Sequence, residues 1–231
     1  MTQIYADGVS LKVIKELKES SDISGFTTNP SLMKKLGCTD YGKDLREMVQ
    51  AAGKKSISVE VISDNPEEIY TQSQKIALWG SNVAVKIPFF SSTGQSLCDV
   101  IKRVAESGVT VNVTAILAMS QIREITNILN QVGKGFISVF AGRIADTGVD
   151  PIPFIDLAVA LSKKCEDVKV IWASPREILN ITQATESGCD IITIPADLLA
   201  KRHLLGKDLE QFSVDTSKMF INDSLAAVFD L

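Results

Sequence analysis

Histidine and cysteine, which supply most transition-metal sites in proteins, are scarce in this sequence. The 231 residues include one histidine, His203, and four cysteines, Cys38, Cys98, Cys165 and Cys189. The cysteines lie far apart and form no CxxC pair, which argues against a zinc ribbon or a redox motif. His203 stands in a basic cluster typical of a protein surface. We therefore expect no metal and no cofactor, and the scattered thiols are typical of the reducing cytoplasm.

Long apolar runs, an excess of basic residues and a glycine-rich nucleotide turn are also missing. No apolar run approaches the ~20 residues that span a bilayer, and the N-terminal MTQIYADGVS lacks the features of a signal peptide. The formal net charge of −4 argues against nucleic acid as a partner, because a basic patch is its usual footprint. No GxGxxG follows the first apolar run, so a dinucleotide-binding sheet is not supported.

Eight short apolar runs, rich in valine and isoleucine, recur along the chain. They are continuous rather than alternating, which is the pattern of parallel strands covered on both faces. The predicted strands are QIYAD (3–7), ISGFTT (23–28), SISVEV (56–61), VAVKIP (83–88), VTVNVT (109–114), FISVFA (136–141), VKVIWAS (168–174) and DIITIP (190–195).

Amphipathic stretches separate these runs and predict helices over 10–20, 41–52, 65–80, 94–107, 118–131, 151–165 and 175–187. Ser10 and Asn65 are placed to cap two of them, and Ser174 with Glu177 has the spacing of a capping box. Strands alternating with helices predict an α/β fold, a single (β/α)8 barrel over residues 1–231. An open doubly wound sheet is the alternative.

A C-terminal stretch, 207–231, extends beyond the eighth strand–helix unit. Its segment 207–229 predicts one or two extra helices with many apolar side chains, namely Leu209, Phe212, Val214, Met219, Phe220, Leu225, Val228 and Phe229. So much apolar surface requires a partner. The extension either folds back on its own barrel or packs on a neighbouring subunit, and the sequence leaves both open.

Lys86 lies inside a run that otherwise predicts a buried strand. Burying an unpaired ammonium is costly, and buried lysines tend to become neutral amines, which attack carbonyl carbons. Glu60 lies in the preceding predicted strand, so the two charges either pair or serve a reaction. We therefore expect an enzyme that forms a Schiff base with a ketone or an aldehyde.

Polar residues also mark the ends of nearly all the predicted strands. Because the chemistry of a (β/α)8 barrel gathers at the carboxyl ends of its strands, these side chains should share one rim. The rim residues are Asp7, Thr27, Thr28, Asn29, Glu60, Lys86, Asn112, Thr114, Ser138, Phe140, Arg143, Ser174, Arg176, Thr193 and Pro195.

Most of these residues also have a purely structural interpretation. Asp7 and Ser174 each precede a predicted helix and Asn29 precedes Pro30, so all three could serve only as caps. Thr114 and Ser138 could bond to nearby backbone, and the two arginines could be surface residues, although both lie where a phosphate could be held. Lys86 and Glu60 are hardest to explain in this way, because buried ion pairs stabilise proteins weakly.

Five motifs in order along the chain resemble the transaldolases, especially the short branch that includes fructose-6-phosphate aldolases. They are FTTNPSL (26–32), VAVKIP (83–88), VNVTAI (111–116), SVFAGRIADTGVDP (138–151) and ASPRE (173–177). The resemblance implies a (β/α)8 barrel that transfers a three-carbon dihydroxyacetone unit through a lysine Schiff base. It also implies homo-oligomers, with rings of five or ten subunits as the form found in this branch.

The resemblance implies a role for most rim residues. Lys86 would form the Schiff base, Asp7 would take the proton of the C4 hydroxyl, and Glu60 with Thr114 would hold the water of imine formation. Substrate binding would fall to the remaining site residues: Asn29, Asn112 and Ser174 on the dihydroxyacetone part, Arg143 and Arg176 on phosphate, and Thr28, Ser138 and Phe140 in the same site.

Phe140 favours transfer over cleavage within this family. Where aldolases of the family carry tyrosine, this chain has a phenyl ring that cannot hydrogen-bond the catalytic water. The implied reaction joins sedoheptulose 7-phosphate and glyceraldehyde 3-phosphate to give erythrose 4-phosphate and fructose 6-phosphate, in the non-oxidative pentose phosphate pathway. A fructose-6-phosphate aldolase is the first alternative. A non-catalytic barrel that binds a sugar phosphate is the second, although a binder has no need of a buried amine.

Overall fold

The computed structural model describes residues 2–227. These residues fall into two compact units, one ending at Leu199 and the other beginning at Ala200. Within residues 2–227, no helix combines the length and the hydropathy needed to cross a bilayer.

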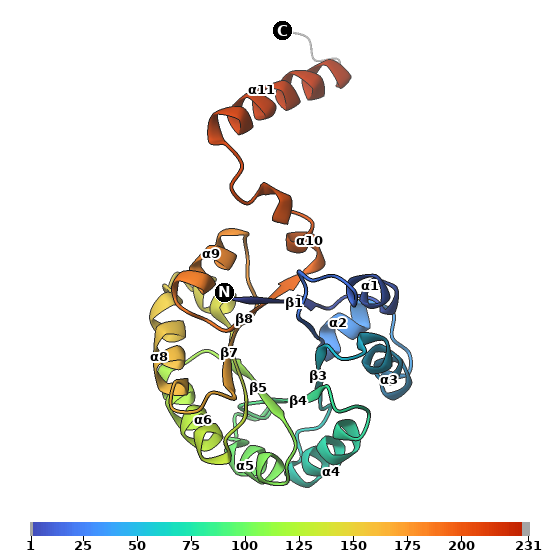
Figure 1. Ribbon diagram of the computed structural model, residues 1–231, viewed down its shortest axis with the longest axis vertical. Helices are drawn as coiled ribbons and strands as arrows, with labels where there is room; N and C mark the ends of the chain where they lie inside the picture. The colour runs from blue at the N-terminus through green and yellow to red at the C-terminus, as the bar shows by residue number, and fades with distance from the viewer. Residues whose placement is uncertain (1, 228–231) are drawn as a thin grey trace. The chain divides into compact units, whose positions relative to one another are not determined.

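The first unit contains a closed barrel of eight parallel strands in sequence order (Figure 1). Pairing of the first strand with the last, from Gln3↔Ile191 to Asp7↔Pro195, closes the ring. This confirms the predicted (β/α)8 barrel and excludes the open sheet. The strands are β1 (Gln3–Asp7), β2 (Gly25–Thr27), β3 (Ser56–Glu60), β4 (Val83–Pro88), β5 (Val111–Ile116), β6 (Gly135–Val139), β7 (Val168–Trp172) and β8 (Ile191–Pro195).

Helices surround the strand ring on its outer side (Figure 1). The long ones follow the apolar periodicity of the sequence, and α3 has the predicted bounds. The helices of this unit are α1 (Leu11–Leu17), α2 (Pro30–Lys35), α3 (Tyr41–Ala52), α4 (Pro66–Ala77), α5 (Cys98–Glu106), α6 (Met119–Val132), α7 (Ala141–Ala145), α8 (Ile152–Ser162), α9 (Leu179–Glu186) and α10 (Ala196–Leu199). The short α2, α7 and α10 were not predicted.

Two of the predicted caps are confirmed. The Ser10 hydroxyl accepts the Val13 N–H, and the Asn65 side chain accepts the N–H groups of Glu67 and Glu68. These bonds satisfy amide groups that have no partner within the first turn of a helix.

The predicted capping box at Ser174 is wrong. Helix α9 begins at Leu179, and Ser174 has a left-handed backbone with φ of +60°. The side chain of Asn180 instead accepts the N–H groups of Arg176 and Glu177, at 2.8 and 3.2 Å. The segment between β7 and α9 is therefore an ordered loop rather than a first helical turn.

Strand β5 lies two residues later than predicted and contains an irregularity. Its pairing with β6 shifts between Val113 and Ile116, and Ala115 in between has φ of +58°. A left-handed conformation is uncommon for a residue with a Cβ, so the apolar pattern alone could not indicate this bulge. Its consequence is that Ala115 reaches the interior at the carboxyl end of the barrel.

The second unit contains a short 3₁₀ turn (Arg202–Leu204) and helix α11 (Leu209–Ala226). The helix lies within the predicted extension, and none of its described residues is buried. His203 is exposed, as expected for its basic cluster. Val228 and Phe229, which the sequence assigned to the extension, lie outside the described residues. The predicted division of the chain at residue 207 stays a prediction.

Aromatic and branched side chains fill the amino-terminal part of the barrel interior. Tyr5 is 4% exposed and packs with Ile171, Ile191 and the partly buried Phe136. Its ring lies against the backbone of β2 at Gly25, where a Cβ would come within 2.6 Å of the Tyr5 ring and 2.8 Å of the Ser56 carbonyl. Gly25 therefore makes room for this layer of side chains.

Replacing Gly25 with alanine tests this packing. We expect G25A to lower the free energy of unfolding by about 1–3 kcal/mol, because a methyl group must displace a buried ring. The measurement is urea denaturation followed by circular dichroism. The matched control is Gly42→Ala in α3, where the nearest atoms lie 3.8 Å from the added Cβ; this change should stabilise by up to about 1 kcal/mol. Equal stability of G25A and wild type would contradict the packing described.

Candidate functional site

A cavity of about 490 Å³ opens at the carboxyl ends of the strands. Most of the predicted site residues line it, which brings together side chains from strands across the whole ring. They are Asp7, Asn29, Glu60, Lys86, Thr114, Ser138, Phe140, Arg143, Ser174 and Arg176, together with Lys35 and others. Thr28 and Asn112 were predicted for the same site, but they do not line the cavity.

Lys86 lies on the inner face of β4, directly beside Glu60 of β3 in the strand register. Its Nζ is 3.2 Å from Glu60 Oε2 and donates to the Thr28 carbonyl at 3.1 Å. The Lys86 side chain is 7% exposed and that of Glu60 15%. The Lys86 side chain is therefore fixed by Glu60 and the Thr28 carbonyl, and its nitrogen can reach a molecule in the cavity.

Glu60 is placed by its strand and by one residue that the sequence analysis missed. Burial raises the pKa of the Glu60 carboxyl, and the charge of Lys86 opposes that rise. The Tyr41 hydroxyl, from α3, donates to the Glu60 backbone carbonyl at 2.8 Å. Burial also raises the pKa of Tyr41. No periodicity in the sequence could indicate the hydrogen bond between Tyr41 and Glu60, because it joins the start of α3 to the end of β3.

Asp7 faces the cavity and does not cap a helix, since Ser10 caps α1. The Thr27 hydroxyl donates to Asp7 Oδ1 at 2.7 Å and also hydrogen-bonds the hydroxyl of Thr193. Burial raises the pKa of the Asp7 carboxyl, while Lys86 and the Thr27 hydrogen bond oppose the rise. A carboxylate with a raised pKa is a stronger base toward a substrate proton.

Thr114 carries a buried hydroxyl without a hydrogen-bond partner among residues 2–227. An unpaired buried polar group is costly, so it points to a bond made with something outside the protein chain. The neighbouring Ala115 is one of two described non-glycine residues with positive φ, and Ser174 is the other. Both line the cavity. Backbone strain of this kind clusters at functional sites.

Thr28 and Asn112 do not line the cavity, but their hydrogen bonds hold residues next to it. The Thr28 hydroxyl donates to the Ser58 carbonyl at 2.8 Å. The Asn112 side chain donates to Ser58 Oγ at 2.9 Å and accepts from Ser138 Oγ at 2.7 Å. These bonds cross β3, β5 and β6 and fix Ser138 where it meets the cavity. Ser58, which the sequence analysis did not single out, belongs to this network.

Asn29 combines a structural and a site position. Its Oδ1 accepts the Leu32 N–H at 2.9 Å, so it caps α2 as the structural interpretation allowed. It also lines the cavity. One residue therefore serves both interpretations, and the cap holds its side chain in place.

Two arginines give the rim of the cavity its positive charge. The Arg143 guanidinium lies 5.0 Å from the centroid of the Phe140 ring, a distance at which a cation is attracted to the ring face. Arg176 forms a two-bond ion pair with Asp146, with Nε–Oδ1 at 3.0 Å and Nη2–Oδ2 at 2.5 Å. Planar guanidinium groups suit carboxylates and phosphates, so this side of the cavity can bind an anion.

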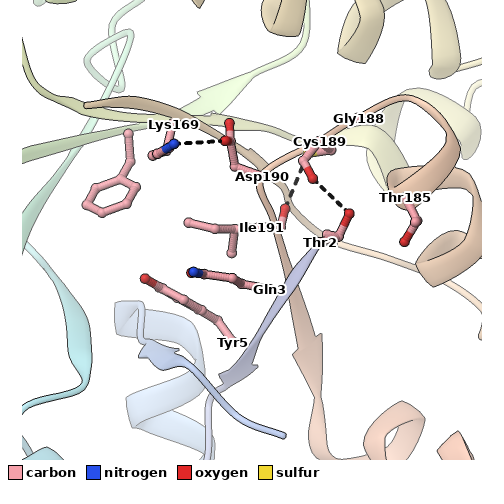
Figure 2. Close-up of a pocket in the computed structure, with 10 residues that line it drawn as sticks. Thr2, Gln3, Tyr5, Lys169, Thr185, Gly188, Cys189, Asp190 and Ile191 are labelled. Carbon is pink, nitrogen blue, oxygen red and sulfur yellow. Dashed lines mark hydrogen bonds and ion pairs between the residues drawn. The ribbon is translucent and has the colours of Figure 1, made fainter. Parts of the chain in front are cut away.

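A second cavity, of about 470 Å³, lies at the amino-terminal ends of β1, β7 and β8 (Figure 2). Its charged groups, Lys169 and Asp190, pair with each other at 3.2 Å, and Asp190 also accepts the Val170 N–H. Thr2 donates to the Cys189 carbonyl. None of its lining residues carries a buried polar side-chain atom that lacks a partner. Because this end of a barrel serves stability rather than chemistry, the Lys86 cavity is the candidate site.

Comparison with known proteins gives an independent view of the chain. Residues 4–229 match the model of a family described as Transaldolase/Fructose-6-phosphate aldolase. A "Probable transaldolase" of Dehalococcoides mccartyi is 32% identical over 85% of this chain and 88% of its own length. A "Probable transaldolase" of Nitrosopumilus maritimus is 30% identical over 94% and 96%.

Solved structures similar to this chain show the fold alone. The N-acetylneuraminate lyase of Mycoplasma synoviae has a TM-score of 0.56 at 8% identity, covering 94% of this chain and 77% of that one. The orotidine 5'-phosphate decarboxylase of Pyrococcus horikoshii has a TM-score of 0.56 at 14% identity, covering 84% and 89%.

The raised pKa of Asp7 predicts that this carboxyl makes the folded protein less stable as the pH rises. As the pH rises from the ordinary aspartate value of 3.8, the unfolded chain loses this proton before the folded protein does. The folded protein therefore loses stability across that window. Asp7→Asn removes the titration, so we expect the variant to be more stable than wild type at pH 7–8. Each kcal/mol gained should raise Tm by about 2–4 °C.

The measurement is calorimetric melting of wild type and D7N between pH 5 and pH 8. The difference in Tm should shrink as the pH falls, because the wild-type carboxyl then regains its proton. A variant that is less stable than wild type at pH 8 would show that the Lys86 charge outweighs the cost of burial.

Proposed function

Because this chain belongs to the Transaldolase/Fructose-6-phosphate aldolase family, we propose that it is a transaldolase that transfers a dihydroxyacetone unit through a Schiff base on Lys86. The observation that carries the proposal is the buried Lys86 amine at the cavity, 3.2 Å from Glu60. A residue that served only stability would not need its nitrogen at the surface of a cavity. The cluster of Lys86, Glu60 and Asp7 likewise argues against a non-catalytic sugar-phosphate binder.

In the first step, the Lys86 amine adds to the carbonyl carbon of a ketose phosphate. The carbonyl oxygen leaves as water, and the carbon–nitrogen double bond of the iminium forms. The ammonium must give up a proton before it attacks, and Glu60 is close enough to receive it. The unpartnered Thr114 hydroxyl is available to hydrogen-bond the departing water. These positions support the assignment of both residues to water handling.

In the second step, Asp7 takes the proton of the C4 hydroxyl, and the C3–C4 bond breaks. Its electron pair moves into the iminium and gives an enamine, while an aldose phosphate leaves. The enamine then attacks the aldehyde carbon of an acceptor, the acceptor oxygen takes the proton back from Asp7, and hydrolysis of the new iminium frees Lys86. The raised pKa of Asp7 suits this role.

The remaining residues bind the substrate in this proposal. Arg143 and Arg176 hold phosphate, and Asn29, Ser138 and Ser174 orient the dihydroxyacetone part. Thr28 and Asn112 act from behind the cavity, because their side chains bond to Ser58 and Ser138. The donors are sedoheptulose 7-phosphate or fructose 6-phosphate, and the acceptors are glyceraldehyde 3-phosphate or erythrose 4-phosphate. This reaction belongs to the non-oxidative pentose phosphate pathway.

The resemblance of the five sequence motifs to the short transaldolase branch supports a cytoplasmic homo-oligomer of five or ten subunits. Helix α11 carries exposed apolar side chains, including Leu209, Phe220 and Leu225. A subunit contact would cover such a surface.

Phe140 supports transfer over the alternative, simple cleavage of fructose 6-phosphate. Its ring lines the cavity beside Arg143. A phenyl group offers no hydroxyl to hold the water that would assist protonation of the enamine carbon and then hydrolyse the resulting iminium. The intermediate should therefore wait for an acceptor aldehyde. A fructose-6-phosphate aldolase would release its products without one.

The test is the release of glyceraldehyde 3-phosphate from fructose 6-phosphate, measured with and without erythrose 4-phosphate. We expect release by wild type to depend on the acceptor. Phe140→Tyr should raise the acceptor-independent rate by up to roughly tenfold, the effect of one added hydrogen bond. Acceptor-independent release by wild type would favour the aldolase. An unchanged ratio in F140Y would contradict the role given to Phe140.

A further inference from the structure

The ion pair between Arg176 and Asp146 leaves part of the Arg176 guanidinium free to bind a phosphate in the cavity. Arg176 lines the Lys86 cavity, whereas Asp146 does not. The carboxylate therefore holds the guanidinium from outside the cavity, through Nε and Nη2. A guanidinium has five N–H donors. The bonds to Asp146 use one edge, so the donors on Nη1 and the second donor on Nη2 stay available to an anion.

The backbone around this pair is fixed on both sides. A Cβ on Gly142 of α7 would lie 1.6 Å from the Ser174 carbonyl oxygen, so the two segments touch at a point where only glycine fits. Asp146 directly follows α7 and is its C-terminal cap residue. The Arg176 N–H is held by the Asn180 side chain at 2.8 Å. Asp146 and Arg176 therefore project from two segments that are locked to each other.

We propose that Asp146 is the positioning residue for Arg176, holding its guanidinium in the orientation that receives the substrate phosphate. A half-exposed arginine samples many rotamers, and freezing them on binding costs entropy. Asp146 freezes the side chain beforehand, as preorganisation does generally. The inference rests on the proposed function for the identity of the anion.

The negative charge of the Asp146 carboxylate also repels a phosphate, which opposes the effect of positioning. Both side chains are about half exposed, at 49% and 52%, so solvent and salt screen that repulsion. The loss of rotamer freedom is not screened in this way. We therefore expect positioning to outweigh repulsion.

The experiment measures KM for glyceraldehyde 3-phosphate and for unphosphorylated glyceraldehyde as acceptors. We expect Asp146→Asn to raise KM for the phosphorylated acceptor by about 2- to 10-fold, and to change KM for glyceraldehyde by much less. Asp146→Glu, which keeps the carboxylate, should recover part of the loss. An unchanged or lowered KM for the phosphorylated acceptor in D146N would overturn the proposal.

The chain offers a matched control. Glu67 of α4 and Arg103 of α5 form an ion pair of the same two-bond kind, at 2.7 and 2.8 Å. Neither residue lines the cavity. Glu67→Gln should leave both KM values unchanged. The same shift in E67Q as in D146N would mean that loss of any such pair perturbs the enzyme, which would overturn a specific role for Asp146.

A double-mutant cycle shows whether Asp146 acts through Arg176. In the Arg176→Ala background, D146N should add little to the rise in KM, because there is no guanidinium left to orient. If D146N raises KM by the same factor with and without Arg176, the positioning role is excluded.

A binding measurement separates this inference from the proposed reaction. Titration calorimetry with inorganic phosphate needs no turnover, and wild type and E67Q should bind it more tightly than D146N. If wild type fails to turn over any sugar phosphate but shows this order, the reaction is wrong and the positioning role stands. Equal phosphate affinity of wild type and D146N would overturn the positioning role alone.

Discussion

The ion pair between Lys86 and Glu60 is the contact on which the rest of the site depends. Taking an ammonium and a carboxylate out of water costs several kcal/mol for each ion, and only close pairing and added hydrogen bonds offset that cost. The parallel register of β3 and β4 places the two residues side by side. The Thr28 carbonyl adds a bond to the lysine. The barrel thus holds an amine at a cavity without leaving it unpaired.

The neighbouring groups follow the same logic. Asp7 is a second partly buried carboxyl near Lys86, and burial raises the pKa of both carboxyls while the charge of Lys86 lowers it. Asp7 and Glu60 thus provide two carboxyl groups near the Lys86 amine, and each of them can accept a proton during the proposed reaction. At the same rim, the Thr114 hydroxyl is buried without a hydrogen-bond partner among the described residues, and Ala115 and Ser174 have a left-handed backbone. Each of these features lowers the stability of the folded protein. A protein selected for stability alone would avoid this concentration of strain and buried charge.

Much of this architecture could be predicted from the sequence. The valine- and isoleucine-rich runs indicated eight covered parallel strands, and the barrel rule placed their polar ends on one rim. The apolar pattern could not indicate the bulge at Ala115 or the loop at Ser174, because both depend on a left-handed backbone rather than on residue type. For Ser174 a capping-box spacing was present, but Asn180 satisfied the same amide groups from further along the chain.

The side-chain partners were harder to predict than the site itself. Thr28 and Asn112 were expected at the substrate, whereas their side chains bond to Ser58 and Ser138 and do not line the cavity. Tyr41 and Asp146 reach the site from helical segments, so no strand-end rule could find them. Asp146 lies inside the SVFAGRIADTGVDP motif, which was the only signal available for it.

The proposed reaction requires that Lys86, and no other lysine, forms the covalent intermediate. Lys35 also lines the cavity, so the site of attachment has to be measured directly. The protein would be reduced with borohydride in the presence of fructose 6-phosphate, digested, and examined by peptide mass spectrometry, with Lys86→Met as the control. We expect a covalent adduct from the reduced Schiff base on the Lys86 peptide of wild type alone. An adduct on Lys35, or no adduct on any peptide, would contradict the proposed role of Lys86.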